Sequence, residues 1–275
     1  MTAPPVMVDQ HRVSLRTGGV ADASGPTIVL VHGAGMDGTV WSQQTRYLSM
    51  RGVRALAVDL PGHGHSEGPA IASIAGMADW LVRVIDALDE AEVTIAGHSM
   101  GTFIALEVAA RFPKLVRSVA LFGTATAMPV HPDLIDAAEH DLARAASLMT
   151  GWSHAPGSRL GRNPTPGLWM TGGVEALVER SKPGVLLSDL LACSRYADAE
   201  ARAASITCPA LVAIGAQDKM TPATSGRAMA KAMVRSAGVE VLEMPSAGHM
   251  SLTEEPRVVR EALLRAARGN SQVTG

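Results

Sequence analysis

Glu92-Val93-Thr94-Ile95-Ala96-Gly97-His98-Ser99-Met100-Gly101 is the stretch from which the rest of the chain can be placed. Its first half is apolar and contains β-branched residues, which predicts a buried strand. The strand pattern stops at Gly97, and apolar residues at helical spacing begin at Phe103. Gly-x-Ser-x-Gly at such a junction is typical of a strand that turns directly into a helix, because the glycines keep side chains out of the tight turn. We therefore predict that Ser99 is exposed on a strained turn, and we take it as the candidate nucleophile.

The composition narrows the class of protein. The chain has 275 residues and a net charge of −2 with both signs interspersed, which fits one large domain and does not indicate a nucleic-acid partner. No apolar run approaches the about 20 residues of a membrane span, so we expect no membrane association. Residues 1–5 do not have the pattern of a signal peptide, and two cysteines are too few for a disulfide framework. We therefore expect a cytoplasmic protein with buried free thiols, while the sequence gives no indication of its oligomeric state.

Strands and helices alternate on both sides of the opening stretch. This alternation predicts an α/β protein with a mostly parallel twisted sheet flanked by helices. The predicted elements are a hairpin over residues 6–16, strands at 27–31, 53–58, 118–122, 210–214 and 239–244, and helices at about 39–49, after Ser73, at 223–234 and from about Glu254.

The alternation lapses between residues 124 and 206, a span too long for a simple connection. Helices are predicted there at 132–149, 173–180 and 185–196, with a Pro/Gly-rich loop at 153–167. We therefore predict that residues 124–206 form a helical cap, inserted into a core made of residues 1–123 and 207–275.

A serine hydroxyl needs a base to remove its proton. His249 lies in Ser246-Ala247-Gly248-His249-Met250, directly after the last predicted strand. Loops that follow parallel strands meet at one edge of the sheet, so His249 is expected near Ser99 and is our candidate base. The other histidines have structural alternatives: His32, His63, His65 and His98 follow strands at the same edge, His131, His140 and His154 lie in the predicted cap, and His11 lies in the hairpin.

An acid is needed to orient the imidazole, and Asp218 follows the penultimate predicted strand. The loop Gly123-Thr124-Ala125, which follows the strand before it, contains no acid, and Asp189 and Asp198 fall within the predicted cap. Aspartate is also a common turn residue. We nevertheless predict that Asp218 holds the imidazole of His249.

The chain order of nucleophile, acid and base is that of the α/β-hydrolase fold. The chain resembles esterase-like serine hydrolases of the α/β-hydrolase superfamily along almost its whole length. The resemblance implies the α/β-hydrolase fold with an inserted helical cap, two oxyanion-hole amides at Met100 and Ala34, no cofactor, and a small-molecule ester substrate. The stretches that carry the resemblance are His32-Gly33-Ala34-Gly35, Asp59-Leu60-Pro61-Gly62-His63-Gly64, Gly97 to Gly101, Gly215-Ala216-Gln217-Asp218 and Gly248-His249.

Two other motifs point to different chemistry. Gly33-Ala34-Gly35-Met36-Asp37-Gly38, with Asp59 some 20 residues later, has the spacing of a dinucleotide-binding fingerprint. An oxidoreductase is therefore a remote alternative, although it leaves the serine, acid and base unexplained, and the bulk of Trp41 suits it poorly. His63 and His65 lack a third ligand at metal-binding spacing, so no metal is expected.

Together with the resemblance, Ser99, Asp218 and His249 predict hydrolysis of carboxylic esters with short-to-medium uncharged acyl groups, through an acyl-enzyme on Ser99. The same residues serve C–C bond, lactone and thioester hydrolases and cofactor-free perhydrolases, and the fold also serves catalytically silent ligand receptors. Inward-pointing cap arginines would instead select an anion; the candidates are Arg144, Arg159, Arg162, Arg180 and Arg195. The predicted pocket residues are His32, Met128, Met149, Trp152, Trp169, Met170 and Met250.

Overall fold

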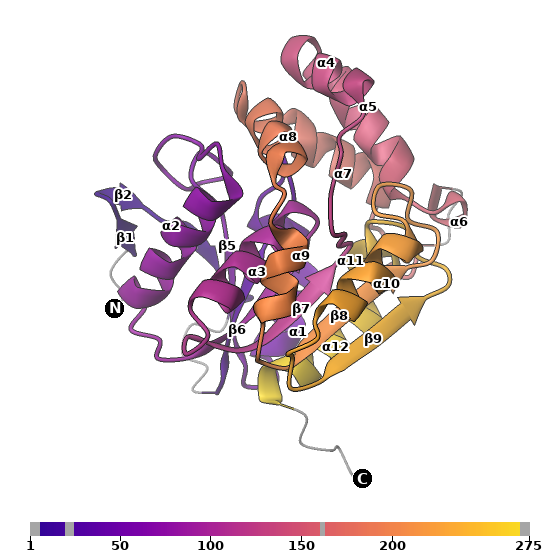
Figure 1. The fold of residues 1–275 in the computed structure, drawn as a ribbon. Coiled ribbons are helices and arrows are strands. Elements are labelled where there is room, and N and C mark those ends of the chain that lie inside the picture. The colour runs from indigo at the N-terminus through magenta and orange to yellow at the C-terminus, as the bar shows by residue number, and fades with distance from the viewer. Residues whose placement is uncertain (1–5, 20–24, 160–162, 270–275) are drawn as a thin grey trace.

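The computed structural model describes residues 6–19, 25–159 and 163–269. The centre of the fold is a seven-stranded sheet (Figure 1). All neighbouring strands are parallel except the first pair, so the predicted mostly parallel sheet is confirmed. In spatial order the strands are β3 (Leu15–Arg16), β5 (Arg54–Val58), β4 (Thr27–Val31), β6 (Val93–His98), β7 (Val116–Phe122), β8 (Ala210–Gly215) and β9 (Val239–Met244).

Helices cover both faces of this sheet, which is why every residue of β4, β6 and β8 is buried. On one face α1 packs against α12, and on the other α3 packs against α2 and α9 (Figure 1). The bounds are α1 (Ser42–Ser49), α2 (Ile74–Ala87), α3 (Met100–Arg111), α9 (Ala199–Ser205), α10 (Ala223–Ala232) and α12 (Pro256–Arg268).

The parallel register determines where the loops of interest lie. Val31 pairs with Gly97, Phe122 pairs with Ala213, and Gly215 pairs with Met244, so these strands end at one edge of the sheet. The loops that carry Ser99, Asp218 and His249 all leave the sheet at this edge, as the strand order required.

The segment between β7 and β8 is largely helical. It contains α4 (Pro132–His140), α5 (Leu142–Ser153), α6 (Pro156–Arg159), α7 (Met170–Glu179), α8 (Val185–Arg195) and α9. In Figure 1, α4, α5, α7 and α8 stand beyond the edge of the sheet, while α9 lies alongside α3 on its face. We call α4, α5, α6, α7 and α8 the inserted helices. Arg162, one of the five arginines considered above, lies outside the described residues, as do residues 1–5.

Several predicted elements end at different residues in the structure. The helix predicted over 132–149 is two helices, because Asp141 breaks it with an extended φ of −150° and caps α5 by accepting from Arg144 N–H. The predicted loop over 153–167 contains α6, and α9 was not predicted. The helix predicted from about Glu254 is α12, which starts at Pro256, whose ring suits a first helical position. A short helix that was not predicted, α11 (Ser251–Glu254), precedes it.

The N-terminal and early elements follow the sequence more closely. β1 (Met7–Val8) and β2 (His11–Arg12) form the predicted hairpin, and β3 leaves it to pair with β5. The predicted helix over 39–49 is a 3₁₀ turn, η1 (Gly38–Trp41), followed by α1. The helix predicted after Ser73 is α2, and Ser73 caps it by accepting from Gly76 N–H.

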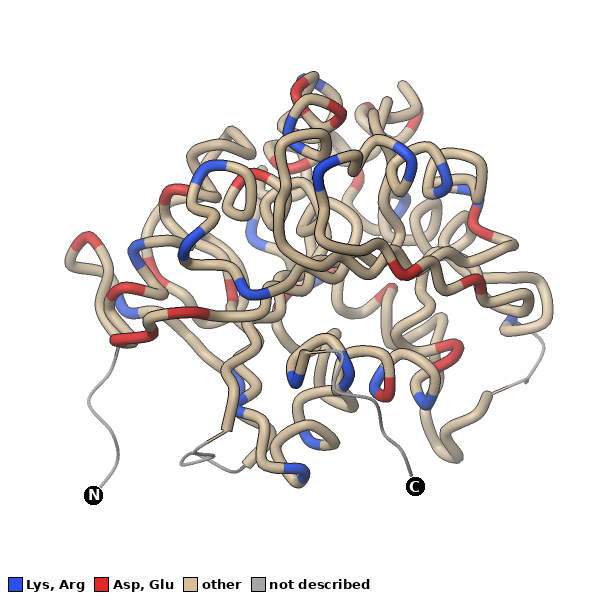
Figure 2. The backbone as a smooth tube through the Cα atoms, turned by 60° about the horizontal axis from the view of Figure 1, so that its bottom comes forward, with Lys and Arg blue, Asp and Glu red and all other residues tan. Residues whose placement is uncertain are grey.

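Charged residues of both signs are spread over the view in Figure 2. Several form exposed ion pairs, among them Arg227 with Glu243 at 2.7 Å and Arg265 with Glu240 at 2.7 Å. None of the helices in residues 6–19, 25–159 and 163–269 is both long enough and apolar enough to cross a membrane.

Candidate active site

Ser99 lies in a strained turn between β6 and α3. Its φ of 52° and ψ of −120° are sparsely populated by residues with a side chain. The turn is tight enough to exclude side chains at both flanking glycines: a Cβ at Gly97 would lie 2.2 Å from the Gly101 carbonyl oxygen, and a Cβ at Gly101 would lie 2.5 Å from that of Val31. The Gly-x-Ser-x-Gly spacing is therefore explained by backbone contact.

His249 and Asp218 are hydrogen-bonded to each other. The His249 Nδ1 lies 2.8 Å from Asp218 Oδ2, and both side chains are almost fully buried. A proton on Nδ1 satisfies this contact and leaves Nε2 of the neutral ring as an acceptor. That Nε2 is buried and has no hydrogen-bond partner among the described residues. The pair thus presents an unoccupied basic nitrogen on a side chain that lines the same cavity as Ser99.

Asp218 accepts three further hydrogen bonds from its own loop. Met220 N–H and Thr221 N–H donate to Oδ1 at 2.8 Å each, and the Thr221 hydroxyl donates to Oδ2 at 2.7 Å. Burial alone would raise the pKa of Asp218, but neighbouring His249 and these donors outweigh burial and hold the pKa below its usual value. Asp218 is therefore a carboxylate at neutral pH. Sequence reasoning missed Thr221, although a threonine three residues after an aspartate is a common turn signal.

The loop of His249 is fixed by two residues that sequence reasoning did not select. Glu254 is buried and accepts from Gly248 N–H and from Ala155 N–H, at 2.8 Å each, so it ties this loop to the inserted segment. His98 donates from Nε2 to the His249 carbonyl oxygen at 3.0 Å, and the two rings are 5.0 Å apart. The contacts of Glu254 with Ala155 and of His98 with His249 could not be read from the sequence, because each joins segments that are distant along the chain.

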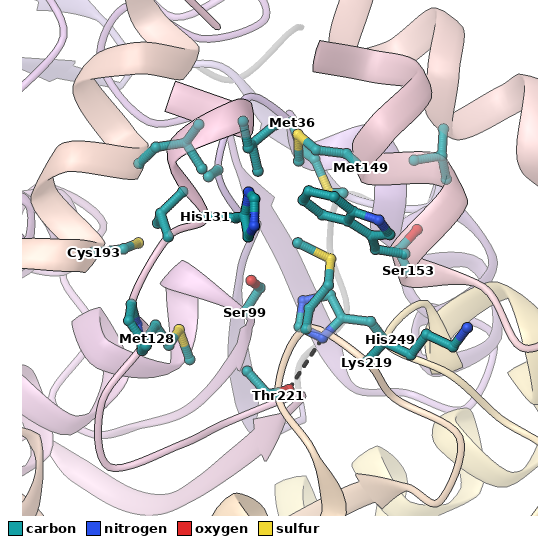
Figure 3. A pocket seen from close by; sticks show the side chains of 18 of the residues that line it. Met36, Ser99, Met128, His131, Met149, Ser153, Cys193, Lys219, Thr221 and His249 are labelled. Atoms are coloured by element: carbon teal, nitrogen blue, oxygen red, sulfur yellow. Dashed lines mark hydrogen bonds between the residues drawn. The ribbon is translucent and has the colours of Figure 1, made fainter. Parts of the chain in front are cut away.

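A cavity of about 710 Å³ opens between the sheet edge and the inserted helices (Figure 3). Ser99 lies near its centre, with His249 on one side and His131 above it in this view. The lining is mainly apolar, and the amine of Lys219, which also lines the cavity, points away from Ser99 in Figure 3. The lining side chains include Ala34, Met36, Met128, Leu134, Met149, Trp152, Val174, Leu190 and Cys193.

Four of the predicted pocket residues lie elsewhere. His32 is buried under the loop, where its Nε2 accepts from Leu60 N–H at 3.1 Å. Trp169 is 74% exposed and folds over Gly172, while Met170 and Met250 are buried in packing contacts outside the cavity lining. For Trp169 and Met170 the prediction was wrong because helical spacing does not reveal which face of α7 meets the cavity. His32 and Met250 lie in core loops, and both side chains turn inward there. Met128, Met149 and Trp152 do line it.

The backbone amides of Ala34 and Met100, which the resemblance implies as oxyanion donors, lie near Ser99. Ala34 lines the cavity, and Met100 is the first residue of α3. Neither N–H has an acceptor within the part of the chain that the structure describes. Buried amides are rarely left without a partner. Because these two have none in the described protein, both can donate to a ligand.

Asp59, the acidic residue that the dinucleotide-binding alternative requires, is not accessible to a cofactor. Asp59 is fully buried, and its two carboxylate oxygens accept from Gly38 N–H at 2.7 Å and from His65 N–H at 2.9 Å. The carboxylate therefore stabilises the loop and is not open to a ribose hydroxyl.

The cysteines are both free, but they differ in exposure. Cys193 is buried and lines the cavity, and Cys208 is half-buried, contrary to the expectation that both are buried. Burial raises the pKa of the Cys193 thiol and raises that of Cys208 to about 11. Both thiols are therefore protonated near neutral pH and are poor competitors of Ser99 as nucleophile.

Two buried histidines predict an acid-sensitive fold. Burial lowers the pKa of His32 to about 4 and that of His98 to about 3, with further lowering by His63 and His249 respectively. In the unfolded chain both histidines titrate near pH 6.5. Below pH 6.5 these two imidazoles bind protons in the unfolded state but not in the folded state. Their contribution to the free energy of unfolding is therefore complete above pH 6.5 and falls as the pH drops below it. Urea unfolding at pH 6.5, 5.5 and 4.5 is expected to show a loss of about 2 to 4 kcal/mol in the free energy of unfolding.

The matched control for this prediction is a histidine at the surface. His98→Asn should make the free energy of unfolding depend less steeply on pH over this range, whereas replacing the exposed His140 by asparagine should leave the slope unchanged. A free energy of unfolding that stays constant from pH 6.5 to 4.5 would contradict the assignment of neutral buried imidazoles.

Comparison with known proteins places the chain in a family. A family model described as "Alpha/beta hydrolase family" matches residues 28–262. The chain is 32% identical over 254 residues to a pimeloyl-(acyl-carrier protein) methyl ester esterase from Chromobacterium violaceum, covering 86% of this chain and 92% of that protein.

Other relatives match over a shorter region. The chain is 38% identical over 124 residues to an uncharacterized protein from Mycobacterium tuberculosis, covering 43% of this chain and 35% of that protein, so the match spans about a third of that relative's length. Among solved structures, the enol-lactonase from Burkholderia xenovorans LB400 superposes with a TM-score of 0.84 at 25% identity, covering 95% of this chain and 98% of that one.

Proposed function

The chain belongs to the alpha/beta hydrolase family, and on that premise we propose that it is a serine hydrolase that cleaves carboxylic esters through an acyl-enzyme on Ser99. One observation carries the proposal. His249 is held at Nδ1 by a carboxylate, its Nε2 has no partner among the residues that the structure describes, and it lines the same cavity as a serine in a strained turn. This is the arrangement that activates a serine hydroxyl.

The chemistry follows from the geometry of these groups. Nε2 of His249 would accept the Ser99 proton as Oγ attacks the ester carbonyl, and it would return that proton to the leaving alcohol. The same nitrogen would then activate water to hydrolyse the acyl-enzyme. The Ala34 and Met100 N–H groups would donate to the oxyanion of each tetrahedral intermediate, each contributing about 3 kcal/mol to lowering the barrier. Asp218 would stabilise the imidazolium that forms in each step.

The cavity favours an uncharged acyl group. Of the five arginines considered in the sequence analysis, the structure describes four, and none of these four lines the cavity. Arg180 pairs with Asp37 at 2.7 Å, and Arg144 pairs with Asp136 at 3.1 Å, so both are engaged elsewhere. A volume of about 710 Å³ is within the range of cavities that enclose small organic ligands. A neutral ester of short to medium length is therefore the substrate class that we propose.

A fluorophosphonate probe tests the proposed function. The reagent should add one phosphonyl group per chain, and peptide mapping by mass spectrometry should place that group on Ser99. In the His249→Ala variant the labelling should be much slower, because the Ser99 hydroxyl then has no base to take its proton. A chain that is folded but gains no adduct, or that gains it on another residue, would disprove the proposal.

A series of p-nitrophenyl esters tests the proposed acyl range. Each methylene buried in the cavity contributes about 0.8 kcal/mol until the cavity is full, after which further length stays in water or strains the inserted helices. The value of kcat/KM is therefore expected to rise with acyl length, reach a maximum in the short-to-medium range, and then fall. The control is a carboxylate-bearing ester of matched length, which should be a poorer substrate than the neutral one. A strong preference for the anion would contradict the assignment.

Lactones form a second candidate substrate class. The observation that favours it is the fold-wide similarity to an enol-lactonase at 25% identity. A lactone is an internal ester, so the same residues would open it without a separate leaving alcohol. Comparing kcat/KM for lactones and for open-chain esters of equal carbon number would decide which class the cavity prefers.

A further inference from the structure

The inserted helix α8 carries a buried carboxylate that contacts two loops of the core. Asp189 has no exposed surface, and its Oδ2 accepts from Gly35 N–H at 2.9 Å and from His63 Nε2 at 2.8 Å. Gly35 follows Ala34 in the loop after β4, whereas His63 lies in the loop after β5. A single oxygen of the inserted segment therefore joins both loops.

His63 must be an imidazolium in this arrangement. Its Nε2 faces the Asp189 carboxylate, and its Nδ1 lies 3.0 Å from the Pro61 carbonyl oxygen. Both neighbours are acceptors, so both ring nitrogens must carry a proton. Burial opposes this charge, but Asp189, the Pro61 carbonyl and Asp59 together outweigh burial and raise the pKa of His63. Asp189 and His63 thus form a buried ion pair, an arrangement in which loss of one partner is costly because the other is left unpaired.

The loop that contains Gly35 has a conformation that suits its contact with α8. Met36 N–H donates to the Gly33 carbonyl oxygen at 3.2 Å, which closes a tight turn over residues 33–36. Gly35 has a φ of 64°, and a Cβ there would lie 2.7 Å from Leu186 Cδ1. Leu186 and Asp189 are three residues apart on α8 and so share one face of it. That face packs on the turn, and the Ala34 N–H, in the middle of the turn, is left without an acceptor in the described residues.

We propose that Asp189 is a positioning residue for the reaction: with its hydrogen bond to Gly35 and its ion pair with His63, it fixes the turn that presents the Ala34 N–H to the oxyanion. The inference rests on the proposed function, because it takes Ala34 as an oxyanion donor. Its consequence is that the inserted segment helps to complete the oxyanion site, in addition to covering the cavity.

Asp189→Asn tests the role of the charge while preserving shape. A donor displaced by a fraction of an ångström stabilises the transition state less, so kcat is expected to fall by about 10- to 100-fold. KM should change by less than about twofold, because the interaction that is lost is made in the transition state. Hydrogen exchange of a peptide covering residues 33–37 should accelerate in the same variant.

Two control variants separate positioning from attachment of the inserted helices. Tyr196→Phe removes another contact between this segment and the core, the 2.8 Å hydrogen bond from the Tyr196 hydroxyl to Glu107. Asp136→Asn is the same chemical change on an exposed residue of α4. Neither should lower kcat or alter exchange of residues 33–37. An equal loss of kcat in Tyr196→Phe would overturn the proposal, since general loosening would then explain the effect.

A measurement on the unsubstituted protein keeps the proposal testable if Asp189→Asn does not fold. The ¹⁵N chemical shifts of the His63 ring at pH 7 should be those of a doubly protonated imidazolium. A neutral His63 ring would overturn the proposal, as would faster exchange of residues 33–37 in Asp189→Asn with unchanged kcat. The ¹⁵N shifts of His63 and the exchange rate of residues 33–37 are measured without reference to catalysis. If the phosphonate probe fails to label Ser99 and the ¹⁵N and exchange results are as expected, the proposed function has failed while the anchoring of the turn by Asp189 stands.

Discussion

Replacing Ser99 by alanine is expected to lower kcat for ester hydrolysis by about 10⁴- to 10⁶-fold while leaving the fold intact. The hydroxyl is the only part of the side chain that is lost, and alanine needs no more room in the turn than serine does. In the proposed mechanism the acyl-enzyme needs that oxygen, so the activity that remains would come from substrate binding and the Ala34 and Met100 amides alone. The measurement is kcat with the best p-nitrophenyl ester, with circular dichroism and urea unfolding to verify the fold.

The serine and the histidine should behave as one unit. His249→Ala is expected to cost nearly as much as Ser99→Ala, and the double variant should be little worse than either, because each step needs both groups. Ser147→Ala, the same change on an exposed position of α5, is the control and should keep full activity. Turnover above a few per cent in a folded Ser99→Ala protein would exclude Ser99 as the nucleophile.

Replacing Asp218 by asparagine is expected to lower kcat by about 10³- to 10⁴-fold, for a reason that the structure makes specific. Met220 N–H and Thr221 N–H both donate to Oδ1, so the asparagine must place its carbonyl oxygen there. Its NH₂ group then occupies the position of Oδ2 and donates to His249 Nδ1. This forces the imidazole proton onto Nε2, which can no longer accept the proton of Ser99.

The control for this variant is Asp198→Asn, an exposed aspartate at the start of α9 that makes no capping hydrogen bond. It should retain wild-type kcat. The ring ¹⁵N shifts of His249 should move to those of the Nε2–H tautomer in Asp218→Asn alone. A loss of tenfold or less would mean that another carboxylate orients His249.

The sequence determined the fold and the positions of the three principal site residues because both depend on local pattern and chain order. Gly97 and Gly101 flank Ser99 at a strand-to-helix junction, and Asp218 and His249 each follow a strand. In a parallel sheet, every such loop lies at the same edge, so the order of elements along the chain is enough to bring these residues close together. No knowledge of side-chain packing was needed for that step.

Only the tertiary structure decided what surrounds these residues. His63 and Asp189 are 126 positions apart, and Gly248 and Ala155 meet through Glu254, which no spacing along the chain foreshadows. Whether an inserted helix turns Met149 or Met170 toward the cavity depends on how that helix packs on others, and both residues carry the same local signal. Local pattern fixes the period of a helix but not its rotation against a distant partner, because that rotation is set by the fit of side chains from segments far apart in the chain.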